Sequence, residues 1–107
     1  MTTPHLAKLT VPLLCLALSP FAQAQSKEAL YTKSLAATCA NCHGTDGKVV
    51  AGSTVTSLAG LDKAYITAQM NAFKTGARPA TVMHQISKGF NDAQIESLAG
   101  YFAAQKK

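Results

Sequence analysis

The sequence has little of what usually fills the interior of a small protein. Its 107 residues include no tryptophan, four phenylalanines and three tyrosines. It has no internal repeat and no convincing alternation of apolar and polar residues, the pattern that would predict β-strands. A chain of this size buries only a thin core. We therefore expect a helical domain in which something other than side chains fills part of the middle.

Acidic residues are also scarce, but the resulting positive charge is moderate. Ten Lys and Arg stand against five Asp and Glu, a formal net charge of +5. The basic residues are scattered and form no helix face interleaved with aromatic residues, so we expect no nucleic-acid partner.

Long hydrophobic runs are missing as well. The stretch "VPLLCLALSPFA" is interrupted by Pro12 and Pro20 and falls short of the roughly 20 apolar residues that a transmembrane helix needs.

The N-terminal residues have the pattern of an export signal. Lys8 provides the positive n-region, the apolar stretch follows, and "AQA" at 22–24 is a small-x-small cleavage site. We expect residues 1–24 to be a cleaved signal peptide, 25–107 to form one domain, and the protein to reside in the periplasm. Lipidation at Cys15 is disfavoured, because the preceding "PLL" lacks the small residue that lipoprotein processing requires.

After cleavage two cysteines remain, in the stretch "TCANCHGTDGK" at 38–48. The pattern C-x-x-C-H is compatible with a zinc site, a redox dithiol or covalent haem attachment. A zinc site would have too few ligands, because the rest of the mature chain offers only His84 and no further thiolate. A thioredoxin-like dithiol would follow a buried strand, whereas "SKEALYTKSLAAT" is rich in alanine and leucine and is typical of a helix.

Haem attachment accounts for all three residues of the motif together. Thiols at Cys39 and Cys42, spaced i and i+3, lie on one face of a helical turn and can reach the two vinyl groups along one haem edge. His43 follows directly and can place its imidazole at the iron. Attachment takes place outside the cytoplasm, so the signal peptide supports it independently. One motif predicts one haem.

Three helices are predicted around this motif. They cover about 27–38, a segment after the N-cap Asp62 that ends at Gly76, and a segment from Asn91 to the end of the chain, with Asn91 and Gln94 as a capping box. Between them lie two segments rich in Gly, Ser, Thr and Pro that predict loops, the second with a short helical turn at 82–88. The apolar faces predicted for the three helices are Leu30, Ser34, Leu35 and Thr38; Ile66, Met70 and Phe73; and Ile95, Leu98, Ala99 and Phe102.

The second axial ligand of the iron has three candidates. Met70 lies on the apolar face of its own helix, which favours core packing. Met83 lies in the irregular segment after Pro79, where a loop can carry a thioether to the far side of the haem, and it is the favoured ligand. His84 follows it, and is interpreted first as a surface imidazole or a neighbour of a haem propionate.

The segments "CANCHGTDG", "LAGLDKAYITAQMNAFKTGARPATVM" and "DAQIESLAGYFAAQ" resemble class I cytochromes c of the cytochrome c4-like group. "GARPATVMHQISKGFNDAQIESLAGYFAAQ" is similar in particular to the haem subunit of flavocytochrome c sulfide dehydrogenases. The resemblance implies an all-α class I cytochrome c fold, with three main helices around one covalent haem. It further implies thioether bonds at Cys39 and Cys42, His43 as proximal ligand and Met83 as distal ligand.

The resemblance also implies that the first and last helices cross, with Ala36 or Ala37 against Leu98, Tyr101 or Phe102. In one respect the sequence departs from this family. Relatives generally have a proline before "LAG" whose carbonyl accepts the proximal imidazole N–H, whereas this chain has "STVTSLAG". A backbone carbonyl near Val55 or Thr56 is the expected replacement.

These observations predict a one-electron carrier without catalysis at the haem, since both axial positions are filled. By resemblance, its partner is an FAD-containing flavoprotein that oxidises sulfide. The alternatives are a free periplasmic carrier that serves an oxidase or another dehydrogenase, and a haem sensor or peroxidase whose distal ligand is displaceable.

Overall fold

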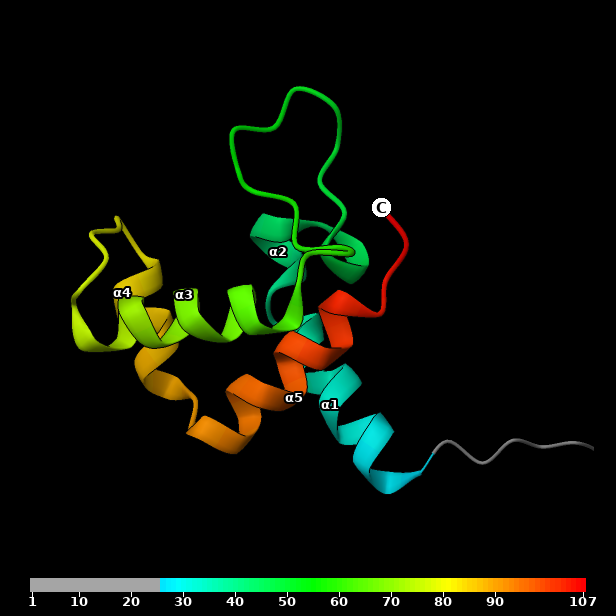
Figure 1. Ribbon diagram of the computed structural model, residues 1–107. Helices are drawn as coiled ribbons and strands as arrows, with labels where there is room; N and C mark the ends of the chain where they lie inside the picture. Colours follow the sequence, from blue (N-terminus) through cyan, green and yellow to red (C-terminus); the bar gives the residue numbers. More distant parts are fainter. Residues whose placement is uncertain (1–25) are drawn as a thin grey trace, which may run out of the picture.

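The regular structure of the chain is helical. The computed structural model describes residues 26–107, so the expected signal peptide at 1–24 lies outside the described residues. The elements in chain order are α1 (Lys27–Ala37), α2 (Ala40–His43), the 3-10 turn η1 (Thr45–Gly47), α3 (Lys63–Thr75), α4 (Met83–Ile86), the 3-10 turn η2 (Ser87–Gly89) and α5 (Asp92–Ala103) (Figure 1). Residues 26–107 contain no strand, and the predicted all-α class is confirmed. None of the helices in this range has the length and apolarity to cross a bilayer.

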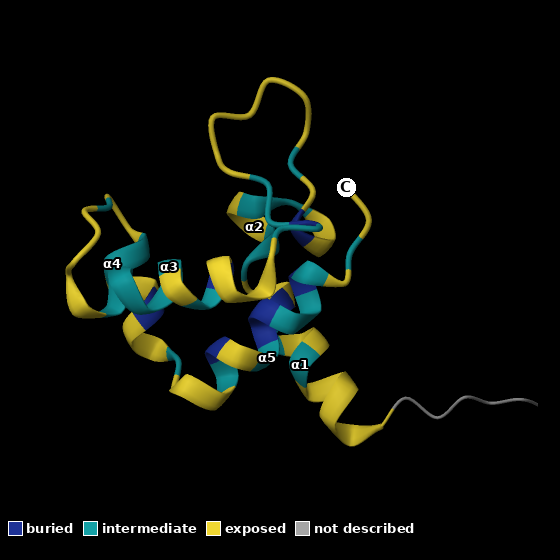
Figure 2. Cartoon of the chain, viewed as in Figure 1, coloured by how far each residue is buried: buried dark blue, intermediate teal, exposed yellow. Residues whose placement is uncertain are grey.

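The core lies where α5 meets α1 and α3. Its buried members are Ala36 from α1, Ile66 from α3, and Leu98, Ala99 and Phe102 from α5. Figure 2 shows these buried positions gathered along α5. Because Ala36 and Ala99 are small, the two helix backbones can approach closely. The expected crossing of the first and last helices is therefore confirmed, with Ala36 rather than the exposed Ala37 in the contact.

The predicted boundaries of α3 and the start of α5 are confirmed by their caps. The side chain of Asp62 accepts the backbone N–H of Tyr65 at 2.9 Å, and Gly76 ends α3 in the left-handed conformation, with φ of 81°. At α5, Asn91 and Gln94 exchange two hydrogen bonds of 2.9 Å each, which is the capping box expected from the sequence. Each such cap stabilises its helix by about 1 kcal/mol. The short turn predicted at 82–88 is also present, as α4 and η2.

The predicted apolar face of α1 is confirmed at Leu35, which packs against the core, and is wrong at its other three positions. Leu30 is 56% exposed, and Ser34 and Thr38 are exposed as well, whereas the buried residue of this helix is Ala36. The reason is the position of the crossing, because α5 passes α1 closely near Ala36, at the C-terminal end of α1 (Figure 1). Only the last two turns of α1 therefore meet the core, and there the close approach of α5 selects alanine.

The last helix ends before the chain does, contrary to the prediction that it runs to the end. α5 stops at Ala103, and Gln105 N–H turns back to the carbonyl of Phe102 at 3.1 Å. The same carbonyl accepts the N–H of Gly60 at 2.9 Å. The segment that leads into α3 therefore occupies the position where a further helical turn would run.

Two clusters of polar contacts join α3 to the α5 segment. The Lys63 ammonium lies 2.9 Å from the Glu96 carboxylate and lowers the pKa of that carboxyl, but both side chains are half exposed and the pair contributes little to stability. Lys74 is more enclosed. Its ammonium donates to the Phe90 carbonyl at 2.8 Å and lies 3.1 Å from Asp92, so it holds the end of α3 against the start of α5.

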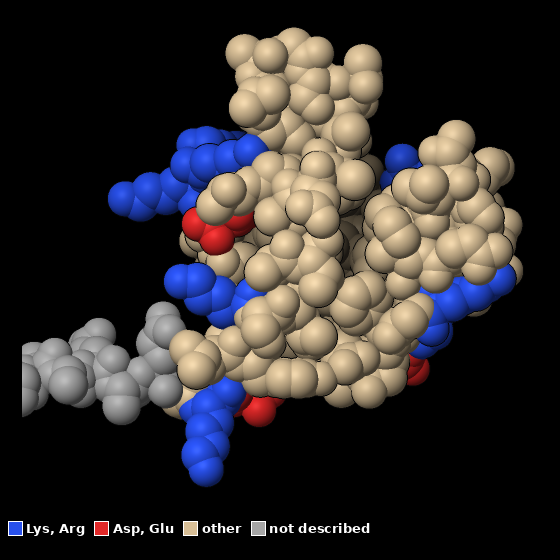
Figure 3. Space-filling model, turned by 180° about the vertical axis from the view of Figure 1, so that it is seen from behind, with Lys and Arg blue, Asp and Glu red and all other residues tan. Residues whose placement is uncertain are grey.

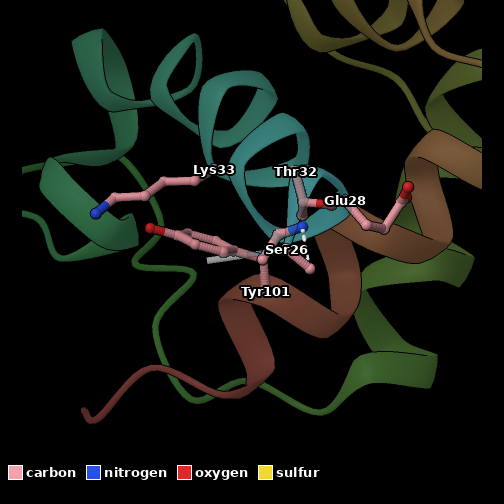
Figure 4. Close-up of a pocket in the computed structure, with 6 residues that line it drawn as sticks. Ser26, Glu28, Thr32, Lys33 and Tyr101 are labelled. Carbon is pink, nitrogen blue, oxygen red and sulfur yellow. Dashed lines mark hydrogen bonds between the residues drawn. The ribbon is translucent and has the colours of Figure 1, made fainter. Parts of the chain in front are cut away.

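A further contact links the segment after α2 to α5. The Tyr101 hydroxyl donates to the carboxylate of Asp46, a residue with φ of 54° inside η1. This bond, together with burial and the negative charge of Asp46, raises the pKa of Tyr101 to about 12. Figure 4 shows the Tyr101 ring lying along α1 beside the stem of Lys33, in a surface pocket also lined by Ser26, Glu28 and Thr32. Tyr101 thus connects α5, α1 and η1.

We predict that Tyr101→Phe destabilises the protein at neutral pH. The variant should also lack the part of the loss of stability at alkaline pH that comes from ionisation of Tyr101. The lost hydrogen bond is worth about 1 kcal/mol. Because the pKa in the folded state is raised above the usual value of about 10, this contribution is complete below pH 10 and is lost as the pH rises towards 12. Urea unfolding of wild type and variant at several pH values measures the difference.

Tyr65→Phe is the matched control, because Tyr65 is 48% exposed and its hydroxyl makes no hydrogen bond within residues 26–107. If Tyr101→Phe showed the same loss of stability between pH 9 and 12 as wild type, the contact with Asp46 would not matter for folding.

Candidate haem site

The three motif residues are presented by a single helical turn. Cys39 is the N-cap of α2, and Cys42 and His43 form its end, with the His43 N–H bonded to the Cys39 carbonyl at 2.9 Å. Gly44 then redirects the chain with φ of 77°. A Cβ at this position would lie 1.8 Å from the Lys48 carbonyl oxygen, so only glycine fits. The sharp exit after His43 keeps the two thiols and the imidazole on one compact turn.

The imidazole of His43 is oriented by the backbone of a distant loop. Its Nδ1 lies 2.7 Å from the carbonyl oxygen of Thr56. A carbonyl only accepts, so Nδ1 carries the proton and donates, and Nε2 keeps its lone pair. The structure thus identifies Thr56 as the acceptor, one of the two positions expected from the sequence. This is the outer-shell contact that a metal-ligating histidine normally makes.

The two cysteines are free thiols in different surroundings. Cys39 packs against the core, and burial raises the pKa of its thiol, with partial compensation from the Thr38 hydroxyl. Cys42 is exposed. In a thioredoxin-like dithiol the first cysteine has a lowered pKa and is readily attacked or oxidised. The raised pKa of Cys39 therefore argues against that alternative.

The candidates for the distal ligand occupy different places. Met70 packs against the core cluster, as its position on α3 predicts. Met83 begins α4 and is partly buried, but it is not among the side chains packed on that cluster. The structure thus assigns Met70 to packing.

His84 differs from the surface imidazole that the sequence suggested. It is partly buried, and its Nδ1 is buried without a hydrogen-bond partner among the described residues. Burying a polar nitrogen without a hydrogen-bond partner costs free energy, so such atoms are rare in folded proteins. This atom therefore points to a bound group that the protein atoms alone do not provide.

The surface has a hollow on the face opposite to the view of Figure 1. Figure 3 shows it between the segment that carries α4 and the rest of the domain, below the protruding loop, with a rim largely free of Lys, Arg, Asp and Glu. Two thiols and an imidazole on one turn, a thioether on another segment and a buried nitrogen without a hydrogen-bond partner together fit a covalently bound haem.

Comparison with known proteins agrees with this geometry. The family model described as Cytochrome c matches residues 29–106. The chain is 38% identical over 73 residues to the cytochrome subunit of sulfide dehydrogenase of Chlorobaculum tepidum, covering 68% of this chain and 64% of that protein. It is 33% identical to the thiosulfate dehydrogenase electron acceptor of Stutzerimonas stutzeri, covering 83% of this chain and 43% of that protein. To cytochrome c4 of Pseudomonas aeruginosa it is 35% identical, covering 88% of this chain and 46% of that protein.

The chain belongs to the cytochrome c family, because the family model matches most of its length. Membership in this family implies haem c bound covalently. The chain spans less than two thirds of the length of the three relatives named above.

Some features of the site were visible in the sequence and others were not. The turn of Cys39, Cys42 and His43 follows from the local motif. The link from Asp46 to Tyr101, which fixes the segment after this turn, spans 55 residues and was not predicted. The one available clue was an aspartate between turn-forming residues in "GTDG", a type that tolerates positive φ.

We predict that the double variant Cys39→Ala, Cys42→Ala loses bound haem and does not fold stably after export. The described core contains few buried apolar side chains, so haem attachment and folding are coupled. Intact mass, the visible spectrum and circular dichroism measure attachment and fold together. Ala93→Ser, at an exposed position of α5, is the control expected to retain haem. A haem-free double variant with cooperative unfolding would contradict the prediction.

Proposed function

We propose that this chain is a periplasmic monohaem c-type cytochrome that transfers single electrons. In this proposal Cys39 and Cys42 carry the thioether bonds, His43 is the proximal axial ligand and Met83 the distal one. The observation that carries the proposal is the hydrogen bond from His43 Nδ1 to the Thr56 carbonyl, which leaves Nε2 free to bind a metal. The single C-x-x-C-H motif in the sequence supports one haem.

The chemistry that the haem supplies is a reversible change between ferric and ferrous iron. The protein's own residues fix the conditions of that change. The Thr56 carbonyl holds the proton on Nδ1 of His43 and leaves Nε2 as the nitrogen that can bind the metal. Met83 contributes a thioether that favours the reduced metal. If His43 and Met83 both bind the iron, substrate would not reach the metal, and the chain would act as a carrier rather than as an enzyme.

The proposed location follows from the expected signal peptide at 1–24, which lies outside the described residues. Cleavage after Ala24 would leave a mature chain that begins at Gln25. Its first described residue, Ser26, accepts the Ala29 N–H at 3.1 Å and caps α1. Cleavage at this position therefore leaves the first helix with its cap.

The proposed electron donor is an FAD-containing flavoprotein that oxidises sulfide. The support is the similarity to the cytochrome subunit of a sulfide dehydrogenase. Oxidation of sulfide to elemental sulfur releases two electrons, so two one-electron transfers to this cytochrome complete one cycle. The similarity to a thiosulfate dehydrogenase electron acceptor favours a second candidate, a free carrier that serves another dehydrogenase of sulfur compounds. An oxidase remains the alternative acceptor of its electrons.

We predict that the native cytochrome co-purifies with a flavin-containing protein and that sulfide reduces its haem within this complex. The measurement is size-exclusion chromatography with flavin and haem absorbance, followed by addition of sulfide. The isolated cytochrome is the control for direct reduction. If the cytochrome elutes alone and thiosulfate with its dehydrogenase reduces it instead, the free-carrier alternative is correct.

We predict that Met83→Ala keeps the covalent haem but loses the charge-transfer band of methionine ligation and lowers the midpoint potential. The reason is that the thioether favours ferrous iron. Visible spectroscopy and a redox titration measure both effects. Met70→Leu is the matched control, because it conserves volume at a packing position and should leave the band and potential near wild type.

An unchanged band and potential in Met83→Ala would move the ligand to Met70 or His84. Binding of carbon monoxide by the reduced wild-type protein at neutral pH would instead favour the sensor or peroxidase alternative, because the distal position would then be open.

A further inference from the structure

The segment between η1 and α3 carries no charged residue at positions 49–61, although the chain is basic overall. Residues 50–56 are all exposed, with Val50 at 78% and Val55 at 37%. They belong to a loop that projects from the domain (Figure 1), and Figure 3 shows this projection free of Lys, Arg, Asp and Glu. An exposed surface of this kind, which includes apolar side chains, is a candidate for contact with another molecule.

The base of this loop, residues 49–57, is fixed to the rest of the domain. The carbonyl of Gly47 accepts the N–H of Leu58 at 2.8 Å and the hydroxyl of Ser57 at 2.9 Å. Gly47 is itself buried, and a Cβ at this position would lie 2.8 Å from the Phe102 ring. The loop is therefore attached to the core through its base, and it starts and ends close to the turn that carries the haem motif.

The middle of the loop contains a β-turn. The N–H of Ser53 donates to the carbonyl of Val50 at 3.1 Å, and Gly52 has a φ of 84°, which suits the third position of a type II turn. The N–H of Val55 in turn donates to the Ser53 hydroxyl at 3.1 Å. Because the turn already has a defined shape, ordering it against a partner costs little conformational entropy.

Basic side chains lie beside the loop. Lys48 directly precedes it and is exposed. The C-terminal tail lies against the segment after the loop, since a Cβ at Gly60 would lie 2.7 Å from the Lys107 side chain. Figure 3 shows basic side chains next to the base of the projection. Asp46, the acidic residue closest to the loop in sequence, accepts the Tyr101 hydroxyl. The loop thus combines an uncharged centre with a basic border.

The composition of the loop favours a protein over a lipid surface as its occupant. Segments that bind in a membrane interface present large side chains such as Trp, Phe and Leu, and residues 49–57 contain none of these. Small uncharged side chains fit a recess in another protein instead. The basic border favours a recess with acidic residues around it, because complementary charges across an interface promote association.

We propose that residues 49–57 are a docking loop for the FAD-containing flavoprotein, where they fit an uncharged recess with an acidic rim. This inference rests on the proposed function, which names that flavoprotein as the electron donor. The similarity to a cytochrome that is a subunit of a sulfide dehydrogenase supports a lasting contact of this kind. The uncharged centre of the loop slows dissociation of the complex, and the border at Lys48 and Lys107 accelerates association.

Two variants and two matched controls separate these contributions. Val50→Asp places a charge in the uncharged centre, and its control is Leu30→Asp, because Leu30 is an aliphatic residue of α1 that is 56% exposed. Lys48→Glu reverses a charge at the border, and its control is Lys27→Glu at the exposed start of α1. All four positions are exposed, so the variants should fold. Each is isolated as the haem protein, and its association with the purified flavoprotein is measured by surface plasmon resonance at several salt concentrations.

The two variants should act on different rate constants. We expect Val50→Asp to accelerate dissociation roughly tenfold, because the new carboxylate is buried in the complex without a partner. We expect Lys48→Glu to slow association roughly threefold at low salt and to weaken its dependence on salt, with little change in dissociation. The controls should bind like wild type. In all four variants the visible spectrum and the midpoint potential should stay at their wild-type values, which separates docking from changes at the haem.

The proposal is overturned if the flavoprotein binds wild type, Val50→Asp and Lys48→Glu equally well. It is also overturned if binding to the flavoprotein is unchanged while Val50→Asp dissociates a dimer of the cytochrome, or releases it from vesicles of phosphatidylcholine and phosphatidylglycerol. Those results would assign the loop to a second copy or to a lipid surface. If wild type itself binds no flavoprotein, the proposed electron donor is wrong, and the inference fails with it.

Discussion

The hydrogen bond from the His43 ring to the Thr56 carbonyl is the contact on which the site depends. It fixes which ring nitrogen keeps its lone pair, and therefore what the imidazole can bind. Two glycines make the contact possible. Gly44 turns the chain directly after His43, and Gly47 anchors the returning loop while packing against Phe102 of α5. The site and the core are consequently parts of one structure rather than separate modules.

The small core supports the proposal that a haem completes the interior. Five buried side chains form the cluster at the crossing of α1, α3 and α5, and two of them are alanines. Such a cluster brings helices together but provides little apolar burial. The buried Nδ1 of His84, which has no hydrogen-bond partner among the described residues, supports the same conclusion. Covalent attachment in this place would supply apolar contact and electron transfer together.

The sequence predicted those features that depend on neighbouring residues. Asp62, Gly76 and the Asn91–Gln94 pair act within one helical turn, so the boundaries of α3 and the start of α5 could be read directly. The buried face of α1 could not, because it depends on where α5 crosses α1. The bond between Tyr101 and Asp46 likewise depends on the fold. The motif turn was predictable, whereas the choice of Thr56 as acceptor required the path of the loop.

The most direct test of the account is the intact mass of the exported wild-type protein, measured together with its visible spectrum. The account predicts a chain that begins at Gln25 and carries the added mass of one haem, with the absorption bands of a low-spin c-type cytochrome. A colourless mature chain without added mass, from cells in which haem attachment to other exported cytochromes works, would contradict it.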